Sequence, residues 1–185
     1  YARTGAMFAC EHYGVVPDII TQAKALGGGV MPVGAFSSTS EIWDSMFGKN
    51  PYLHSSTFGG NPLACAAVIA AIKVTKEEGL VERSKTLGEK LLSGLKEVQV
   101  NHPNMVKDVR GKGLLAGVEF AVEDIASLVI AGCGRRDLLV AYSLNNPKVI
   151  RIEPPLIIEE SELDRAINII NEAISEASEL LKGVF

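Results

Sequence analysis

Short apolar runs separated by glycines and prolines characterise the first part of the chain. The runs at residues 15–20 and 32–36 predict two strands, and the Ile19-Ile20 pair that ends the first run predicts that this strand is buried. Residues 40–47 predict a short helix with a hydroxyl residue as its cap. This part of the chain therefore indicates α/β structure.

The next helix is predicted from Asn61 and Pro62, an amide cap followed by a proline at the first helical position, where the missing N–H costs nothing. Residues 63–72 of this helix are apolar on every side, whereas a helix that faces water is apolar along one stripe. We therefore expect the helix to be buried all round, in a core or in a subunit interface, and Gly79 to end it.

The second part of the chain shows longer helical patterns and clearer strands. Leucines of the segment 80–98 fall on one face of a helix, and residues 161–181 follow the three-and-four spacing of an amphipathic helix. Ser161 is the predicted cap of the latter helix and Gly183 its predicted end. Four strands are predicted between these helices, at residues 106–109, 114–122, 138–144 and 149–152.

The two parts meet near residue 77, in the connection between two helical patterns. We predict an α/β fold in two domains. Residues 1–76 are expected to be the end of a larger α/β domain, and residues 77–185 a small α+β domain of strands with covering helices.

Composition and charge exclude several classes of function. The chain has 185 residues, of which 47% are hydrophobic and 22% charged, and these fractions exclude general disorder. The net charge of −4 gives no electrostatic footprint for nucleic acid. The longest nearly apolar stretch, residues 63–72, is too short to span a bilayer. We therefore expect neither a nucleic-acid nor a membrane partner.

The cysteines and histidines predict a reducing compartment and no metal site. An odd number of widely spaced cysteines with apolar neighbours indicates free thiols, and hence a cytoplasmic protein. Cys133 precedes two arginines, whose charges lower the pKa of a thiol that is accessible. The three histidines, His12, His54 and His102, lie far apart and lack the spacing of metal ligands.

Lys24 is the first candidate for chemistry, because it stands between an apolar strand and the three glycines 27–29. A lysine amine in an apolar site acts as a nucleophile and forms a Schiff base with an aldehyde. Glycines beside it let the backbone approach a ligand closely. On spacing alone, a surface lysine before a flexible loop is the commoner alternative.

A hydroxyl-rich and glycine-rich turn is the second candidate. Ser56 and Thr57 lie just before the predicted helix start at Asn61, and such turns bind anions, phosphate especially. An ordinary capping turn is the alternative, and spacing alone does not separate the two.

Arg151 is the third candidate, because it interrupts a β-branched strand and is predicted to face away from Ile150 and Ile152. A planar guanidinium matches a carboxylate through two parallel hydrogen bonds. A strand arginine that is paired with Glu153 or exposed to solvent is the alternative.

These segments together resemble the class III (ornithine-type) aminotransferases, which use pyridoxal phosphate. The matching motifs run in family order along the whole chain, and they are Arg3-Thr-Gly, Pro17-Asp, Ala23-Lys-Ala-Leu-Gly-Gly-Gly, Pro32-Val-Gly-Ala, Ser56-Thr-Phe-Gly-Gly-Asn-Pro-Leu-Ala, Arg110-Gly-Lys-Gly-Leu and Arg151-Ile-Glu-Pro-Pro-Leu. The resemblance therefore displaces the alternatives for Lys24, Thr57 and Arg151. Within the family, residues 27–35 and 144–155 look most like the putrescine (diamine) aminotransferases. Acetylornithine and ornithine aminotransferases, or a related aminomutase, are the alternatives.

The resemblance implies a fold-type I pyridoxal-phosphate transferase and a role for each matched residue. Lys24 would hold the cofactor as a Schiff base and then act as the general base that moves a proton. Thr57, assisted by Ser56, would bind the cofactor phosphate across the interface of a homodimer or of a dimer of dimers. Arg151 would bind a carboxylate, which for a diamine donor is that of the oxo-acid acceptor, 2-oxoglutarate.

The chain is also much shorter than members of this family. The family's acidic residue for the pyridine nitrogen and its ring-stacking aromatic residue lie upstream of the matched segments. We therefore expect the chain to be the C-terminal portion of a longer enzyme and to be inactive alone. The hypothesis from another class is a non-catalytic module for dimerisation or folding.

Overall fold

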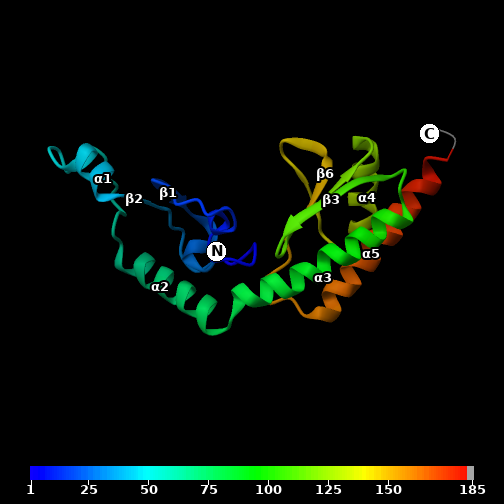
Figure 1. Ribbon diagram of the computed structural model, residues 1–185, viewed down its shortest axis with the longest axis horizontal. Coiled ribbons are helices and arrows are strands. Elements are labelled where there is room, and N and C mark those ends of the chain that lie inside the picture. Colours follow the sequence, from blue (N-terminus) through cyan, green and yellow to red (C-terminus); the bar gives the residue numbers. More distant parts are fainter. Residues whose placement is uncertain (183–185) are drawn as a thin grey trace. The chain divides into compact units, whose positions relative to one another are not determined.

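The computed structural model describes residues 1–182, which fold into two compact units (Figure 1). The first unit comprises Tyr1 and Met7–Gly79, and the second comprises Ala2–Ala6 and the described residues from Leu80 onward. Within the described part, no helix is both long enough and apolar enough to cross a membrane.

The first unit contains a two-stranded antiparallel sheet of β1 (Ile19–Gln22) and β2 (Ala35–Ser38). The short 3₁₀ helix η1 (Ala9–Tyr13) precedes β1, and a second one, η2 (Lys24–Gly27), follows it. Both strands were predicted, but the prediction that the first is buried is wrong. Ile19 is 53% exposed, because β1 has a single neighbouring strand among the described residues.

Helix α1 (Ser40–Phe47) follows β2, as the sequence predicts. Its hydroxyl cap is Thr39, whose Oγ1 accepts a hydrogen bond from the backbone N–H of Ile42 at 3.4 Å. The ring of Trp43 stacks on that of Phe36 in β2, with 5.6 Å between their centroids. This aromatic contact fixes the helix to the sheet.

Helix α2 (Pro62–Glu77) begins as predicted, because Asn61 Oδ1 accepts hydrogen bonds from the backbone N–H groups of Leu63 and Ala64 at 3.0 and 3.1 Å. Gly79 follows the helix with a φ of 61°. The expected burial is not found among residues 1–182. Of this helix only Ala64 is buried, and Leu63 and Ile69 are 69% and 66% exposed. A subunit interface over α2 stays a prediction.

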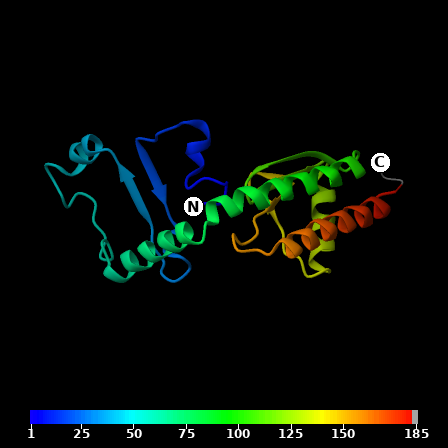
Figure 2. The ribbon, with the colours of Figure 1, turned by 60° about the horizontal axis from the view of Figure 1, so that its bottom comes forward.

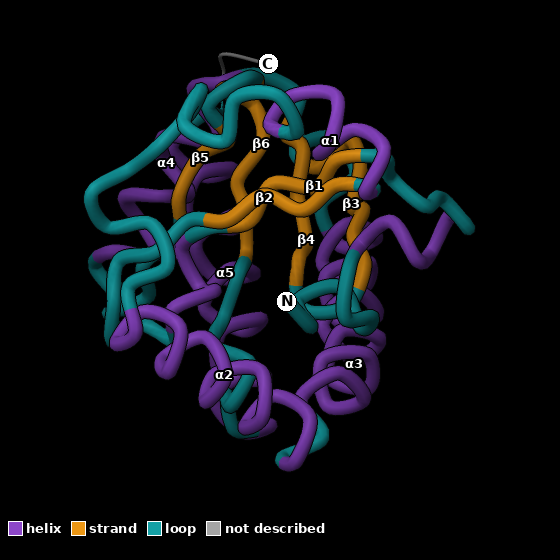
Figure 3. The backbone as a smooth tube through the Cα atoms, turned by 90° about the vertical axis from the view of Figure 1, so that its left-hand side faces the viewer, coloured by secondary structure: helices purple, strands orange, loops and turns teal. Residues whose placement is uncertain are grey.

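The second unit contains a four-stranded antiparallel sheet in the order β3-β4-β6-β5, drawn in orange in Figure 3. Its elements in chain order are α3 (Leu80–Asn101), β3 (Val106–Lys112), β4 (Leu115–Phe120), α4 (Glu123–Gly134), β5 (Ala141–Ser143), β6 (Asn146–Ile152) and α5 (Glu160–Leu180). The predicted strands and the two long helices are all present, with shifted ends. Figure 2 shows α3 and α5 running side by side, and both α3 and α4 pack on α5.

The core of the second unit lies between the sheet and its helices. Val109, Val118 and Ile150 form a row across three strands, and all three are buried under α3 and α4. The neighbouring row, Arg110 and Arg151 on either side of a glycine, shows exposed arginines, because successive residues of a strand alternate between the two faces.

The second unit differs in some details from what its sequence predicts. Helix α4 was not predicted, because its short apolar run shows no side-chain cap and its burial leaves no polar stripe to read. The predicted cap Ser161 is wrong, since Glu159 is the N-cap residue and makes no side-chain capping bond. The predicted helix end at Gly183 lies outside the described residues.

Cys133 is buried in this core, and the burial raises the pKa of its thiol to about 11 despite the charge of Arg136.

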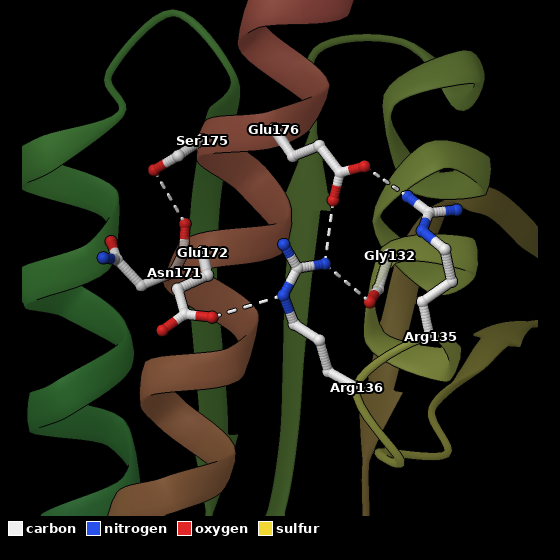
Figure 4. Close-up of polar contacts among 7 residues, drawn as sticks. All are labelled: Gly132, Arg135, Arg136, Asn171, Glu172, Ser175 and Glu176. Carbon is white, nitrogen blue, oxygen red and sulfur yellow. Dashed lines mark hydrogen bonds and ion pairs between the residues drawn. The ribbon is translucent and has the colours of Figure 1, made fainter.

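Helices α4 and α5 are also joined by a cluster of ion pairs (Figure 4). Glu176 binds Arg135 Nη2 at 2.6 Å and Arg136 Nη1 at 2.8 Å, and Arg136 Nε binds Glu172 at 3.2 Å. Arg136 Nη1 also donates to the backbone oxygen of Gly132 at 2.9 Å. Hydrogen bonds from Arg136 and then Arg135 lower the pKa of Glu176.

Gly88 of α3 is expected to be intolerant of a side chain. A Cβ at this position would lie 2.2 Å from the backbone carbonyl carbon of Gly113, in the turn between β3 and β4. Gly88→Ala should therefore lower the free energy of unfolding by about 1–3 kcal/mol in a denaturant titration. Gly94→Ala is the control on the same helix, because its Cβ would meet the flexible end of Ile167 at 2.7 Å. Equal losses in the two variants would contradict the backbone clash.

The Glu176 cluster is expected to make stability depend on pH in acid. Because the folded pKa of Glu176 lies below the unfolded value of about 4.3, the stabilisation is complete above that value and is lost as the pH falls through the folded pKa. Glu176→Gln should lower the midpoint of thermal unfolding at pH 7, and the difference from wild type should shrink as the pH falls below about 4.3 and vanish once the pH is below the folded pKa. Glu97→Gln, an exposed change on α3, is the control. A difference for Glu176→Gln that stays constant with pH would refute this role.

Candidate functional site

Lys24 begins η2 directly after β1 and adopts a backbone conformation that is rare for its residue type. Its φ is 55°, in the left-handed region, where a residue with a Cβ is strained. Gly28 and Gly29 follow with φ values of 62° and 75°. A Cβ at Gly28 would lie 3.1 Å from Ala71 Cβ of α2, so this turn packs closely on the helix. The strand, the turn and α2 therefore hold the backbone of an exposed lysine in place.

The turn before α2 offers hydroxyl groups rather than a free helix end. Ser56 Oγ accepts a hydrogen bond from the N–H of Phe58 at 3.3 Å, and its backbone oxygen accepts one from Gly59 at 3.0 Å. The first N–H groups of α2 already bind Asn61. Thr57 is exposed, and the described residues give its hydroxyl no hydrogen-bond partner. The turn therefore presents the hydroxyls of Thr57 and Ser56, while the first N–H groups of α2 are already bonded to its cap.

The first unit contains a cavity of about 940 Å³ that is lined by part of the turn before α2. It lies among β2, α2 and the turn before α2, and Ser56, Gly59 and Gly60 line it. Gln22 and His54 line it as well, and neither was predicted as a residue of this site. A polar residue at the end of an apolar strand was the available signal for Gln22. Lys24 and Thr57 are not among the residues that line the cavity.

Arg151 lies in β6 opposite Gly117 of β4 and Ala141 of β5. As predicted, it faces away from Ile150 and Ile152, which are 0% and 6% exposed. Residues opposite each other share a face of the sheet, so the small neighbours leave the guanidinium uncovered from both sides. Arg151 Nη1 pairs with Glu153 Oε2 at 3.7 Å, which is the contact that the sequence left as the alternative.

The four predicted site residues thus fall into the two units. Lys24, Ser56 and Thr57 belong to the first and Arg151 to the second. Within the described residues no group of three or more histidine, cysteine, aspartate or glutamate side chains is placed to hold a metal ion.

Comparison with known proteins identifies relatives over nearly the whole chain. Residues 1–174 match the family model of class III aminotransferases. The chain is 46% identical to a putrescine aminotransferase of Pectobacterium atrosepticum over 180 residues, which cover 97% of this chain and 37% of that protein. The chain therefore spans little more than a third of the length of this curated relative.

Solved structures of the same family share the fold. The ornithine aminotransferase of Toxoplasma gondii has a TM-score of 0.88 and 33% identity, over 98% of this chain and 42% of that one. The acetylornithine aminotransferase of Elizabethkingia anophelis has a TM-score of 0.84 and 37% identity, over 95% and 43% of the two chains. The predicted fold, the C-terminal part of a pyridoxal-phosphate aminotransferase, is confirmed.

The left-handed backbone of Lys24 gives a prediction that does not depend on any ligand. Lys24→Gly should be more stable to unfolding than Lys24→Ala by about 1 kcal/mol, because glycine adopts a positive φ without strain. Lys96, within α3, is the control, and there the order should reverse because alanine favours a helix over glycine. Thermal unfolding of the four variants tests both orders. A Lys24→Ala variant as stable as Lys24→Gly would contradict the strain.

Proposed function

Because the chain belongs to the class III aminotransferases, we propose that it carries the cofactor lysine of an enzyme that moves an amino group from a diamine to 2-oxoglutarate. Putrescine is the proposed donor, supported by the 46% identity to a putrescine aminotransferase. Ornithine or acetylornithine is the second candidate, since the solved relatives that act on them are 33% and 37% identical. The observation that carries the proposal is Lys24 itself, held in a strained conformation at the start of a glycine turn.

The described residues fit pyridoxal phosphate, the cofactor of this family. The same cofactor partly occupies the active site of the Toxoplasma gondii ornithine aminotransferase. Lys24 supplies an exposed primary amine, which is the group that attaches the cofactor aldehyde. The Thr57 hydroxyl, with Ser56 beside it, offers donors that suit the phosphate. When bound, the cofactor withdraws electrons from the donor carbon and so makes its proton removable.

Each residue then has a task for which its chemistry is suited. Lys24 would hold the cofactor, and its Nζ, when free and neutral, would accept the proton from the donor carbon and later return it, acting as general base and then as general acid. Thr57 and Ser56 of one subunit would hold the phosphate end across the dimer interface and so keep the reacting carbon within reach of the amine in the other subunit. Arg151 binds a carboxylate of the acceptor, for which its exposed guanidinium and small strand neighbours leave room.

A homodimer, alone or as a dimer of dimers, is the proposed assembly in the cytoplasm. Its support is the exposed apolar face of α2, where Leu63, Ile69 and Val74 are 69%, 66% and 45% exposed. Such a patch favours a protein interface. The free cysteines Cys10, Cys65 and Cys133 agree with a reducing compartment.

The proposal is tested on the complete polypeptide that carries this chain. Borohydride traps the covalent link between cofactor and lysine, and peptide mapping should place the label on Lys24. Lys24→Ala should remove both the label and turnover with putrescine, whereas Lys96→Ala, an exposed change on α3, should preserve both. A label on another lysine would refute the assignment. A higher kcat/KM with ornithine or acetylornithine than with putrescine would show that putrescine is not the preferred amino donor.

A further inference from the structure

A strap, Ala2–Ala6, belongs to the second unit although the residues on either side of it belong to the first. The strap lies against α3 and the turn between β3 and β4. A Cβ at Gly113 in that turn would be 2.5 Å from a carbonyl carbon of the strap, and a Cβ at Gly5 would be 2.9 Å from Lys85 Cβ of α3. Both contacts therefore require glycine. The proposed reaction gives the motif of this strap, Arg3-Thr-Gly, no role.

The backbone of Arg3 is fixed by buried hydrogen bonds. Its carbonyl oxygen accepts hydrogen bonds from Ser84 Oγ at 2.7 Å and from the N–H of Leu114 at 2.9 Å, and this N–H also lies 3.3 Å from Ser84 Oγ. Ser84 and Leu114 are both 0% exposed. Since a buried polar group without a partner is unfavourable, the three groups satisfy one another. None of these bonds uses the Arg3 side chain, so a substitution there leaves the strap anchored.

The Arg3 side chain joins the ends of two strands. Its Nη1 donates to the backbone oxygen of Leu114, which directly precedes β4, at 3.3 Å, and to that of Pro154, two residues after β6. The pairing of β4 with β6 ends at Ala116 and Ile152, and in this register Leu114 and Pro154 would face each other two steps further on. The guanidinium therefore connects the strands just beyond the point at which their own pairing stops. This connection is called the clamp.

Two prolines explain why the strands need the clamp. Pro154 and Pro155 have no N–H to donate to a neighbouring strand, so the ladder of hydrogen bonds cannot continue through them. The guanidinium of Arg3 supplies donors in their place. Burial lowers the pKa of Arg3, and the charge of Glu153 acts in the opposite direction, but an arginine stays charged at neutral pH. A charged donor forms the stronger kind of hydrogen bond, so one side chain can hold both strand ends.

Arg151 lies close to the clamped end of β6. It pairs with Gly117, one step before the ladder between β4 and β6 ends, and with Ala141, the first residue of β5. Its contact with Glu153 is 3.7 Å long, which is outside the range of a hydrogen bond, so this contact does not fix the guanidinium. The position of Arg151 therefore depends on the backbone of β6, and the ends of an element open more readily than its middle.

We propose that Arg3 is a positioning residue for Arg151, because its clamp closes the open end of the β4–β6 pair and so holds Arg151 where the acceptor carboxylate binds. The inference rests on the proposed function, in which Arg151 serves the acceptor. Arg3 acts without touching the substrate, since its Nη1 is engaged by two backbone oxygens. Without the clamp the end of β6 would be open for a larger fraction of the time, and the apparent affinity for the acceptor would fall by that fraction.

The test uses the two half-reactions of the complete enzyme. Arg3→Met keeps an unbranched stem and removes every donor, and it should raise the KM for 2-oxoglutarate about three- to tenfold, as expected when the closed state falls to roughly a third to a tenth of the population. The KM for putrescine should stay unchanged, because a diamine has no carboxylate for Arg151 to bind. A general loss of structure would worsen both substrates together. Arg3→Lys retains a charged donor and should restore part of the affinity for 2-oxoglutarate.

Glu176→Gln is the control for stability, because it loosens the contact between α4 and α5 without touching the clamp, and it should leave both KM values unchanged. Hydrogen exchange adds a readout that does not depend on any substrate. The backbone amides of residues 149–152 in β6 should exchange faster in Arg3→Met than in wild type or in Glu176→Gln. Equal exchange in the three proteins would overturn the clamp.

Arg151→Gln separates the inference from the function on which it rests. In the Arg151→Gln background, Arg3→Met should add nothing to the KM for 2-oxoglutarate, because Arg3 acts through Arg151. If the two effects add, Arg3 acts independently, and the inference is overturned while the carboxylate site stands. If Arg151→Gln alone leaves the acceptor KM unchanged, the carboxylate site fails, and the positioning role fails with it.

Discussion

Burial of Ile150 and Ile152 decides where Arg151 points, and the candidate carboxylate site depends on that direction. Both isoleucines enter the core between the sheet and its helices, and Arg151 between them must take the other face. A slip of one residue in the pairing of β4 with β6 would bury the guanidinium and expose two apolar side chains. The hydrophobic core therefore fixes the position of a charged group that it does not contact.

The residues around Arg3 show why some of this arrangement is invisible in the sequence. The backbone oxygen of Arg3 accepts hydrogen bonds from Ser84 Oγ at 2.7 Å and from the N–H of Leu114 at 2.9 Å, and its side chain reaches Pro154. Arg3 is thus bound to three segments that lie far away along the chain. The motif Arg3-Thr-Gly was recognisable by resemblance, but nothing local to it encodes those partners, which exist only once the second unit has folded.

Elements with a clear period or a specific cap were predictable, and elements defined by their surroundings were not. The leucines of α3 and the stripe along α5 follow the helical repeat, and Asn61-Pro62 marks a helix start by its own chemistry. Helix α4 is short, apolar and uncapped, so its sequence is equally compatible with a buried strand. The exposure of α2 could not be predicted from its composition. An apolar helix indicates that other residues should bury it, but it does not indicate which segment or subunit they belong to.

The residues of the candidate site could be predicted from local sequence signals, but their conformations and charge pairs could not. Lys24, Ser56, Thr57 and Arg151 were candidates from residue type and spacing, the resemblance gave them roles, and those roles stay predictions. The positive φ of Lys24 and the loose pair of Arg151 with Glu153 required coordinates. Electrostatic pairing depends on distances that sequence spacing does not give. Arg110 and Arg151 each stand near acidic residues in the sequence. Only the structure shows that Arg110 makes short ion pairs at 2.6 and 2.7 Å, whereas the pair between Arg151 and Glu153 is 3.7 Å long.

The position of Thr57 links cofactor binding to assembly in the proposed enzyme. Thr57 stands six residues before Leu63, the exposed apolar residue in the first turn of α2, and the Asn61 cap holds the end of the turn against that helix. In the proposed dimer, a subunit bound over Leu63 would therefore lie against the helix that the turn with Thr57 leads into. Cofactor bound at Thr57 and a partner bound over α2 would then stabilise each other, since each orders the turn that the other needs. If both roles hold in the proposed enzyme, linkage makes the effect reciprocal, and a change that weakens the cover over Leu63 would also weaken the hold on the phosphate.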